Sequence, residues 1–316
     1  MISPVAFIVL AHNDAPKVRR LLGALGAADV FLHCDRRTTG AIANAMLPRS
    51  GGNIVAVPRV QAKPFTWSLV EVELSGLRLA LARSQAEHIV VMSGACYPLV
   101  SLEELSVEME GWRGRSRFEL NPLPYKPWNT RWHRDGGSWR FCRRFAMRHG
   151  RLLTVGRVPF IVGRRQVPRE LLLHASAHWK IYSRIHAKAL LQALDANPEQ
   201  VRFWRGAYAP EEACAASLLR SPAFVGDLSD TVVDDLPWFI RWPTQPPKAH
   251  PVWLGPEDFD RLAVARSAAP RDPLRTIATT ERSGFRKLFA RKVGSAATGL
   301  LDRIDEELRG KECEVA

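Results

Sequence analysis

The sequence contains few cysteines and no long apolar run. Its five cysteines are scattered, odd in number and without a Cys-x-x-Cys pair, so neither a disulfide framework nor a structural zinc site is expected. No run approaches the roughly 20 apolar residues that span a bilayer. No basic segment precedes the short apolar run at residues 5–10, which indicates a strand rather than a signal peptide. These absences predict a cytoplasmic protein in a reducing compartment.

What the sequence does have is an excess of positive charge. The formal net charge is +13 over 316 residues. Such a charge favours anionic partners: nucleic acid, an acidic lipid surface or a phosphorylated small molecule. A basic surface without a specific partner is an equally good interpretation. No recognised nucleic-acid-binding module is present, so nucleic acid is not expected as a partner, whereas peripheral contact with the anionic inner face of a membrane remains open.

Apolar periodicity in the first hundred residues alternates between strand and helix. The expected strands cover residues 5–10, 30–33, 53–57 and 88–92, and the expected helices cover 16–25 and 68–82. This alternation predicts an α/β fold with a mostly parallel central sheet and helices on both faces. Residues 93–98 follow a strand at its carboxyl end, where open α/β sheets bind ligands, and form a candidate ligand loop.

The rest of the chain is less regular. Residues 113–168 show little period and are expected to be an irregular, Trp-rich and Pro-rich functional excursion. Further helices are predicted at residues 183–194, 211–219, 257–268 and 299–308, with a loop at 267–283. No internal repeat is visible.

Two consecutive carboxylates, Glu211 and Glu212, follow Pro210 at the start of a predicted helix. Acidic residues in the first turn are what helix capping and the helix dipole favour, so a structural role is the simpler interpretation. The alternative is a general base that faces a cleft and accepts a proton from a substrate hydroxyl.

Other charged or metal-binding residue types also allow two interpretations. The basic run 286–292 is either a solvated surface or a clamp for a diphosphate. Asp35, after the second strand, either accepts hydrogen bonds from a nucleoside or pairs with the arginines that follow it. His174, His178 and His186 lack the Cys or carboxylate partners of a zinc pattern and are expected to be structural. The triplet 258–260 (Asp-Phe-Asp) lies in a predicted helix and is not expected to bind metal.

Taken together, ordered motifs along the chain resemble the core 2/I-branching β-1,6-N-acetylglucosaminyltransferases, a family that includes the peptide O-xylosyltransferases and bacterial relatives. The similar segments are residues 6–12 (AFIVLAH), 31–37 (FLHCDRR), 67–74 (WSLVEVEL), 93–99 (SGACYPL), 176–184 (SAHWKIYSR), 209–212 (APEE) and 283–292 with 301–305. Each motif is short, and the ordered set is what carries the resemblance. It favours the bacterial branch of the family.

The resemblance implies a GT-A-like transferase that moves GlcNAc or xylose from a UDP-sugar to a saccharide hydroxyl with inversion. It implies one glycosyltransferase domain made of a nucleotide-binding half (1–110), an acceptor and catalytic half (111–265) and a basic segment (266–316) that completes the donor site. Basic residues would take the place of a metal at the diphosphate, so no cofactor is expected.

By position in these motifs, the resemblance assigns the catalytic base to Glu212. Donor contacts are implied for His12, Asp35, Ser93, Gly94, Lys248, Arg291 and Lys292. Acceptor contacts are implied for Glu119, Trp179 and Glu211.

Two departures from the family pattern bear on the donor site. Cys96 stands where the 93–98 loop of the family has Asp, and residues 250–254 lack the basic residue that follows His-Pro in many relatives, with Lys248 as the candidate substitute. These departures motivate an alternative, a non-catalytic nucleotide- or carbohydrate-binding protein on the same scaffold.

Overall fold

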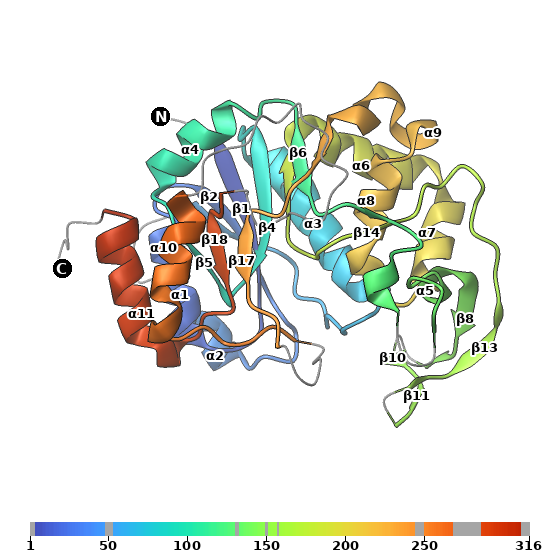
Figure 1. Ribbon diagram of the computed structural model, residues 1–316, viewed down its shortest axis with the longest axis horizontal. Helices are drawn as coiled ribbons and strands as arrows, with labels where there is room; N and C mark the ends of the chain where they lie inside the picture. Colours follow the sequence, from blue (N-terminus) through green and yellow to red (C-terminus); the bar gives the residue numbers. More distant parts are fainter. Residues whose placement is uncertain are drawn as a thin grey trace.

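A computed structural model describes residues 4–47, 53–129, 133–148, 151–156, 158–243, 250–267 and 286–310. Its centre is a seven-stranded sheet in the order β16-β6-β15-β4-β1-β2-β3 (Figure 1). The strands are β1 (Val5–Ala11), β2 (Asp29–Cys34), β3 (Asn53–Ala56), β4 (His88–Ser93), β6 (Ser116–Phe118), β15 (Lys180–Ser183) and β16 (Val232–Asp234). β15 runs antiparallel to β4 and β6, and the other pairs in the sheet are parallel. The α/β fold with a mostly parallel central sheet is therefore confirmed.

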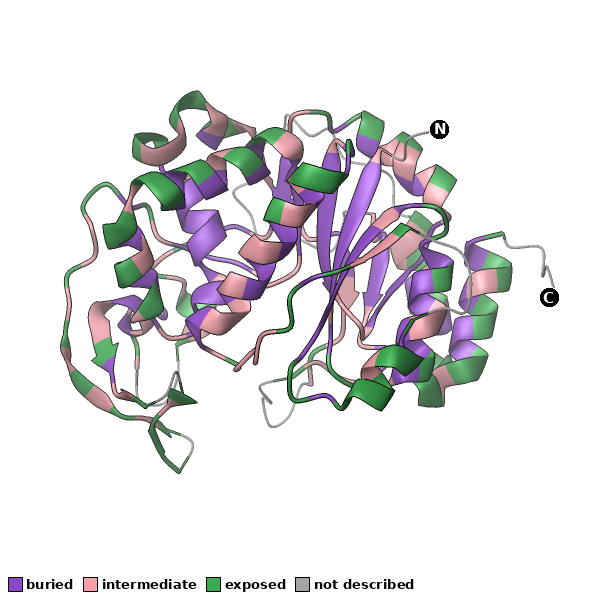
Figure 2. Cartoon of the chain, turned by 180° about the vertical axis from the view of Figure 1, so that it is seen from behind, coloured by how far each residue is buried: buried purple, intermediate pink, exposed green. Residues whose placement is uncertain are grey.

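Helices cover both faces of this sheet, because side chains of its strands alternate between two apolar cores. Phe7 and Val9 of β1 pack with residues of α1, α10 and α11, whereas Ile8 packs with α3, α6 and α8. Figure 2 shows the buried strands between the two helical layers. The helices are α1 (Ala15–Ala24), α2 (Gly40–Ala45), α3 (Trp67–Arg83), α4 (Leu102–Glu110), α5 (Trp139–Cys142), α6 (Arg184–Ala196), α7 (Pro198–Arg205), α8 (Cys214–Leu219), α9 (Pro222–Val225), α10 (Phe259–Ser267) and α11 (Thr298–Arg303).

A second sheet joins distant parts of the chain. It has three strands in the order β17-β18-β5, namely β17 (Trp238–Ile240), β18 (Phe289–Arg291) and β5 (Cys96–Pro98). Arg291 lies opposite Cys96 in the antiparallel pair of β18 and β5. The loop expected at residues 93–98 is thus only partly a loop, since Cys96–Pro98 is a buried strand. This pairing brings the basic C-terminal segment to the carboxyl end of β4.

The excursion at 113–168 is more regular than expected. It supplies β6 to the central sheet, and β7 (Asn121–Pro122) pairs with β14 (His174–Ala175). It then forms a set of short antiparallel strands, β8 (Arg143–Phe145), β9 (Met147–Arg148), β10 (Arg151–Leu152), β11 (Thr154–Val155), β12 (Val158–Pro159) and β13 (Ile161–Arg164). These ribbons extend away from the central sheet at the lower right of Figure 1. Such strands are two to four residues long, which is why no period is visible in the sequence.

Three other sequence predictions need correction. The helix expected at 211–219 is a 3₁₀ helix, Pro210–Glu212, followed by α8 after a break at Ala213. The helix expected at 299–308 changes after Arg303 into a π-helical turn, Ile304–Leu308. His174 and His178 have the sequence spacing of one helical turn, but His174 lies in a strand, so the two do not share a helical face. The loop predicted at 267–283 lies outside the described residues except for Ser267, which ends α10. None of the described helices is long and apolar enough to span a membrane.

Candidate active site

Three predicted donor residues lie at the carboxyl ends of neighbouring strands. His12 follows β1, Asp35 follows β2 and Ser93 ends β4. Backbone bonds extend the sheet pairing one step further, with Asp35 N donating to Ala11 O at 2.9 Å and Gly94 N donating to Leu10 O at 2.9 Å. The sheet register thus brings these residues to one edge, as predicted from the strand pattern.

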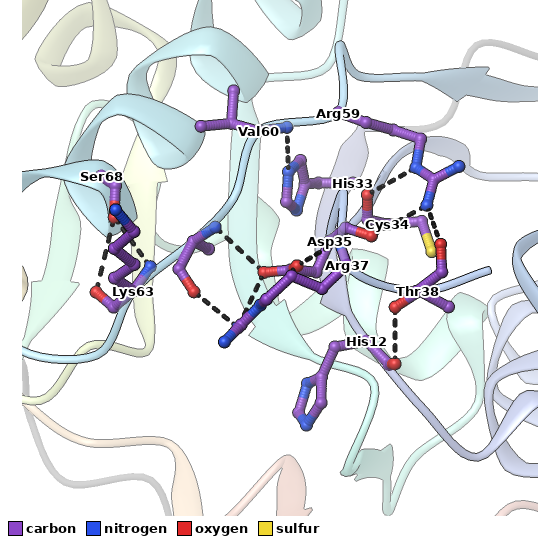
Figure 3. A network of polar contacts seen from close by, with 11 residues as sticks. His12, His33, Cys34, Asp35, Arg37, Thr38, Arg59, Val60, Lys63 and Ser68 are labelled. Carbon is purple, nitrogen blue, oxygen red and sulfur yellow. Dashed lines mark hydrogen bonds and ion pairs between the residues drawn. The ribbon is translucent and has the colours of Figure 1, made fainter. Parts of the chain in front are cut away.

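Asp35 organises the loop after β2 (Figure 3). Its carboxylate accepts hydrogen bonds from Arg37 N at 2.8 Å, Arg37 Nε at 3.0 Å and Ala62 N at 2.9 Å. Burial raises the pKa of Asp35, but the hydrogen bonds from Arg37 and Ala62 outweigh it, so that the pKa lies below its ordinary value. Arg59 fixes the same loop through the carbonyls of Cys34, at 3.2 Å, and Asp35, at 3.0 Å. Asp35 therefore remains anionic, and its carboxylate is already hydrogen-bonded to two residues, Arg37 and Ala62.

His12 lies where two groups of cations meet. Its carbonyl accepts from Thr38 Oγ1 at 2.7 Å, and Figure 3 draws no contact to its ring. Partial burial lowers the pKa of His12, with Asp35 opposing and Arg37, Arg291 and Lys292 adding to the decrease. Thr38 bonds the His12 carbonyl, and Ser295 N donates to Asp14 Oδ2 at 2.9 Å, so the loop after β2 and the C-terminal segment both lie against the loop after β1.

Arg291 and Lys292 are held by aromatic and neutral groups. The Arg291 guanidinium donates to Ser93 Oγ, lies 3.8 Å from Cys96 Sγ and sits 4.2 Å from the Trp179 ring centroid. The Lys292 ammonium lies 5.0 Å from the Trp253 ring centroid. Partial burial and the neighbouring Arg291 lower the pKa of Lys292. Among the described residues neither cation has a carboxylate partner, so both can bind an anion.

Lys17 supports the turn after β4, and the sequence analysis did not identify it. Its buried ammonium donates to Gly94 O at 3.2 Å and to Cys96 O at 2.7 Å. Burial lowers the pKa of Lys17 to about 8. Gly94 itself is required by packing, since a Cβ there would lie 2.8 Å from Val18 Cγ2. A signal was present: Lys17 lies four residues before Leu21, on the apolar stripe of α1.

The two consecutive carboxylates have opposite environments. Glu212 Oε2 lies 2.7 Å from Arg140 Nη1, and the Glu212 side chain is 35% exposed. Glu211 is 5% exposed, with Oε1 accepting from Phe65 N at 3.1 Å and Oε2 without a hydrogen-bond partner among the residues that the structure describes. Burial and, secondarily, Glu212 raise the pKa of Glu211 to about 8. Glu212 is thus the more accessible of the two carboxylates, whereas Glu211 is buried.

A tight turn before the 3₁₀ helix gives the two neighbouring carboxylates these opposite directions. Ala209 has a φ of 51° and Phe65 a φ of 62°, both in the left-handed region. Ala209 N donates to Phe65 O at 3.1 Å, and the Phe65 ring stacks on Tyr208 at 5.2 Å. Left-handed backbone at non-glycine residues is costly and gathers at functional sites. Here it turns one carboxylate inward and the next outward.

A buried ionic layer anchors the acidic pair. Lys180 Nζ lies 3.1 Å from Glu73 Oε2 and donates to Glu211 O at 3.2 Å. The Tyr182 hydroxyl also donates to Glu73, and His178 Nε2 lies 3.7 Å from Glu73 Oε2. Burial lowers the pKa of His178 well below its ordinary value. Neither Glu73 nor Lys180 was singled out by the sequence analysis, because only the fold brings α3 against β15.

The segment between β14 and β15 connects the acidic pair to the cations. Ser176 N donates to Glu212 O at 2.7 Å, and Trp179, three residues later, lies beneath the Arg291 guanidinium. The His178 and Trp179 rings stack at 4.6 Å. The structure therefore brings Trp179 next to the predicted donor residues rather than placing it only on the acceptor side.

The remaining predicted residues are more peripheral or not described. Glu119, after β6, is half-buried and accepts from Asn121 Nδ2 at 3.1 Å. Lys248 lies outside the described residues. A pocket of about 460 Å³ opens beside the loop after β3, lined among others by Arg36, Arg59 and Arg205. Its basic lining suits an anionic group.

Histidines and acidic residues do not form a metal site in the described part of the chain, where no group of three His, Cys, Asp or Glu could hold an ion. His174 Nδ1 lies 2.9 Å from Leu172 O, and His186 contacts Ser183 Oγ at 2.6 Å and Leu228 O at 3.0 Å. Both rings therefore have hydrogen-bond partners within the protein. Asp258, from the discounted triplet, accepts from Gly255 N at 3.0 Å and pairs with Arg241 at 3.1 Å.

A family model described as Core-2/I-Branching enzyme matches residues 5–263, which is most of the chain. The chain belongs to this family. Its members are glycosyltransferases, so the predicted family and enzyme class are confirmed. The match includes β1, the loop after β2, the turn after β4 and the Glu211–Glu212 pair.

Several solved structures are similar to parts of this chain. HddC from Yersinia pseudotuberculosis has 11% identity and a TM-score of 0.28, and the match covers 58% of this chain and 78% of that chain. The 4-diphosphocytidyl-2C-methyl-D-erythritol synthase from Anaerococcus prevotii has 10% identity and a TM-score of 0.31, with 62% and 76% covered. Both TM-scores are low, and these likenesses say nothing about the chemistry of the chain. The comparison with curated proteins found no match.

Proposed function

We propose that this glycosyltransferase moves a sugar, GlcNAc or xylose, from a UDP-sugar to a saccharide hydroxyl with inversion at the anomeric carbon. The observation that carries the proposal is the arrangement of Arg291 and Lys292, two cations without a carboxylate partner in the described structure, at the edge formed by His12, Asp35 and Ser93. A diphosphate is the group that such a pair of cations neutralises.

Glu212 is the general base of the proposed reaction. Its exposed carboxylate accepts the proton of the acceptor hydroxyl while the hydroxyl oxygen forms a bond to the anomeric carbon. The bond between that carbon and the β-phosphate oxygen breaks on the opposite face, and UDP leaves. Arg291 and Lys292 neutralise the charge that develops on the diphosphate, which is the role a divalent metal has in other transferases.

Cys96, which stands where the family has Asp, is compatible with the proposed donor site. Its thiol is fully buried and lies 3.8 Å from Arg291 Nη1. A carboxylate at this distance would form an ion pair with Arg291, whereas a neutral thiol leaves the guanidinium to an anionic ligand. The departure at residue 96 therefore supports a binding role for Arg291.

The remaining contacts are assigned by their places around this centre. His12, Ser93 and Gly94 line the donor edge, and Asp35 holds the loop that receives the uridine. Trp179 supports Arg291 from below, and Glu119 lies on the acceptor side beyond β6. The basic pocket lined by Arg36, Arg59 and Arg205 suits an acceptor that carries an anionic group.

The test compares Glu212→Gln with Glu211→Gln, each assayed for transfer with a panel of UDP-sugars and saccharides and for UDP binding by calorimetry. Glu212→Gln is expected to lower the transfer rate by about 10²–10⁴-fold and to retain UDP binding. Glu211→Gln serves as the matched control and should retain transfer within about tenfold. EDTA should leave the rate unchanged. Full activity of Glu212→Gln would overturn the assignment of the base. UDP binding by the wild type without transfer to any acceptor of the panel would indicate the non-catalytic alternative.

A further inference from the structure

An apolar stripe flanked by arginines is exposed on the ribbons that extend from the catalytic half. The described residues 143–148, 151–156 and 158–164 form this basic arm. Its exposed large apolar side chains are Leu153 (42%), Val155 (72%), Val158 (56%), Phe160 (52%) and Val162 (57%). Five such side chains within ten residues are unusual on a soluble surface.

Four of these side chains lie on one face of the arm. Val155 is opposite Val158 in the antiparallel pair of β11 and β12. Phe160 N donates to Leu153 O at 2.9 Å, which continues the same register by one pair. Because opposed residues and residues two apart share a face of a ribbon, Leu153, Val155, Val158 and Phe160 form one stripe. Val162 is exposed as well, at a register shift between Ile161 and Gly163.

The charge around this stripe has a single sign. Arg144, Arg148, Arg151 and Arg164 are exposed on the arm, and Arg148 lies opposite Arg151 in the pair of β9 and β10. The sequence contains no Asp or Glu between residues 136 and 169. An exposed apolar stripe on an arm whose charged residues are all basic is complementary to an anionic bilayer, in which acyl chains lie beneath phosphate headgroups.

The base of the arm is joined to the site of the acidic pair. The Phe145 ring lies 5.8 Å from those of both Trp139 and Tyr208, and Tyr208 N donates to Arg140 O at 3.0 Å. Arg140 in turn holds Glu212. A surface that binds the arm would therefore lie next to the carboxylate that faces the acceptor.

We propose that the basic arm docks on an anionic phospholipid bilayer, with the stripe from Leu153 to Phe160 inserted and the arginines at the headgroups. Docking in this orientation presents Glu212 to acceptors held at the membrane surface, a consequence that rests on the proposed function, whereas docking itself does not.

Flotation of the full chain with vesicles tests the docking. Vesicles of phosphatidylglycerol and phosphatidylcholine should bind the protein, and phosphatidylcholine alone should bind it much more weakly. Val155→Ser with Val158→Ser should lower partition by about tenfold or more. Arg148→Gln with Arg151→Gln should lower it by about 25-fold at low salt, or about fivefold for each arginine. The matched control is Val107→Ser with Val264→Ser, which changes two valines of 67% and 71% exposure outside the arm and should bind like the wild type.

Three results would overturn the proposal. The first is that the Val155→Ser, Val158→Ser protein binds vesicles as strongly as the wild type. The second is that the wild type binds neither kind of vesicle. The third is that the wild type is a dimer in sedimentation and that the two serines convert it to a monomer without any effect on lipid binding. UDP titration of each variant verifies that the donor half is folded. If the wild type bound vesicles but not UDP, the docking would stand and the proposed function would fail.

Discussion

Arg140 Nη1 lies 2.7 Å from Glu212 Oε2, and the Arg140 guanidinium sits 3.9 Å from the Trp128 ring centroid. The pair joins α5 to the 3₁₀ helix Pro210–Glu212, two elements about seventy positions apart in the sequence. Because the aromatic ring limits the movement of the guanidinium, the ion pair sets the direction of the Glu212 carboxylate as well as its charge environment.

Replacement of Arg140 by Met should therefore lower kcat by about 10- to 100-fold, since misplacement of a catalytic group by about 1 Å is enough for such a loss. UDP affinity should stay within about twofold. Steady-state kinetics and UDP calorimetry measure the two effects. Arg78→Met is the control, because its pair with Asp195 is on the surface with both side chains about half exposed. An unchanged kcat for Arg140→Met would show that Glu212 needs no orientation by this arginine.

Arg291→Met should weaken UDP binding by about 10- to 100-fold, because it removes a charge-assisted contact to the diphosphate. Trp179→Leu should weaken it by about fivefold through loss of the cation–π contact with Arg291. Calorimetry with UDP measures both, and Arg83→Met, at the exposed C-terminal end of α3, is the control. If uridine without phosphates lost affinity in Arg291→Met as strongly as UDP does, Arg291 would not be a diphosphate ligand.

Glu211→Gln should stabilise the protein in alkaline buffer. Burial raises the pKa of Glu211 from 4.5 to about 8, so the folded state holds a proton that the unfolded state has released between these pH values. This residue's contribution to the free energy of unfolding is therefore full below about pH 4.5 and is lost as the pH rises to about 8. Urea denaturation at several pH values should show a difference between wild type and variant that grows by several kcal/mol across this window, roughly 1.4 kcal/mol for each unit. A constant difference would mean that Glu211 is ionised in the folded protein.

Lys17→Met should destabilise the turn after β4 by about 1–3 kcal/mol at neutral pH, because two buried carbonyls lose their donor. The free energy of unfolding of the wild type, relative to that of this variant, should rise further between pH 8 and 10.5. In this range Lys17 is protonated in the unfolded chain but has lost its proton in the folded chain, because burial lowers its pKa there. Thermal and urea denaturation measure the change. Arg19→Met, on the same helix, is the control; equal effects of the two substitutions would contradict the role given to the Lys17 ammonium.

Local sequence patterns predicted the parts of the fold that local physics determines. The first four strands and helices α1 and α3 have strong apolar periods, and their order is enough to place His12, Asp35 and Ser93 at one edge of a parallel sheet. β6 and β15 were missed because they are three and four residues long, with too few positions to show a period. For Lys17, the sequence indicated only a charged residue on the apolar stripe of α1, not its contacts with the turn after β4.

The sequence by itself determined the α/β order, the excess of positive charge and the presence of two consecutive carboxylates after Pro210. Only the tertiary structure decided which carboxylate is buried and which is accessible, because this depends on the left-handed turn at Ala209 and on contacts with Phe65 and Arg140. It also brought Arg291 to Ser93 and Trp179, which are more than a hundred positions away in the chain. Helix and strand periods arise from neighbours in sequence, whereas the direction of a side chain in a site is set by partners that only the packed sheet and its helices bring together.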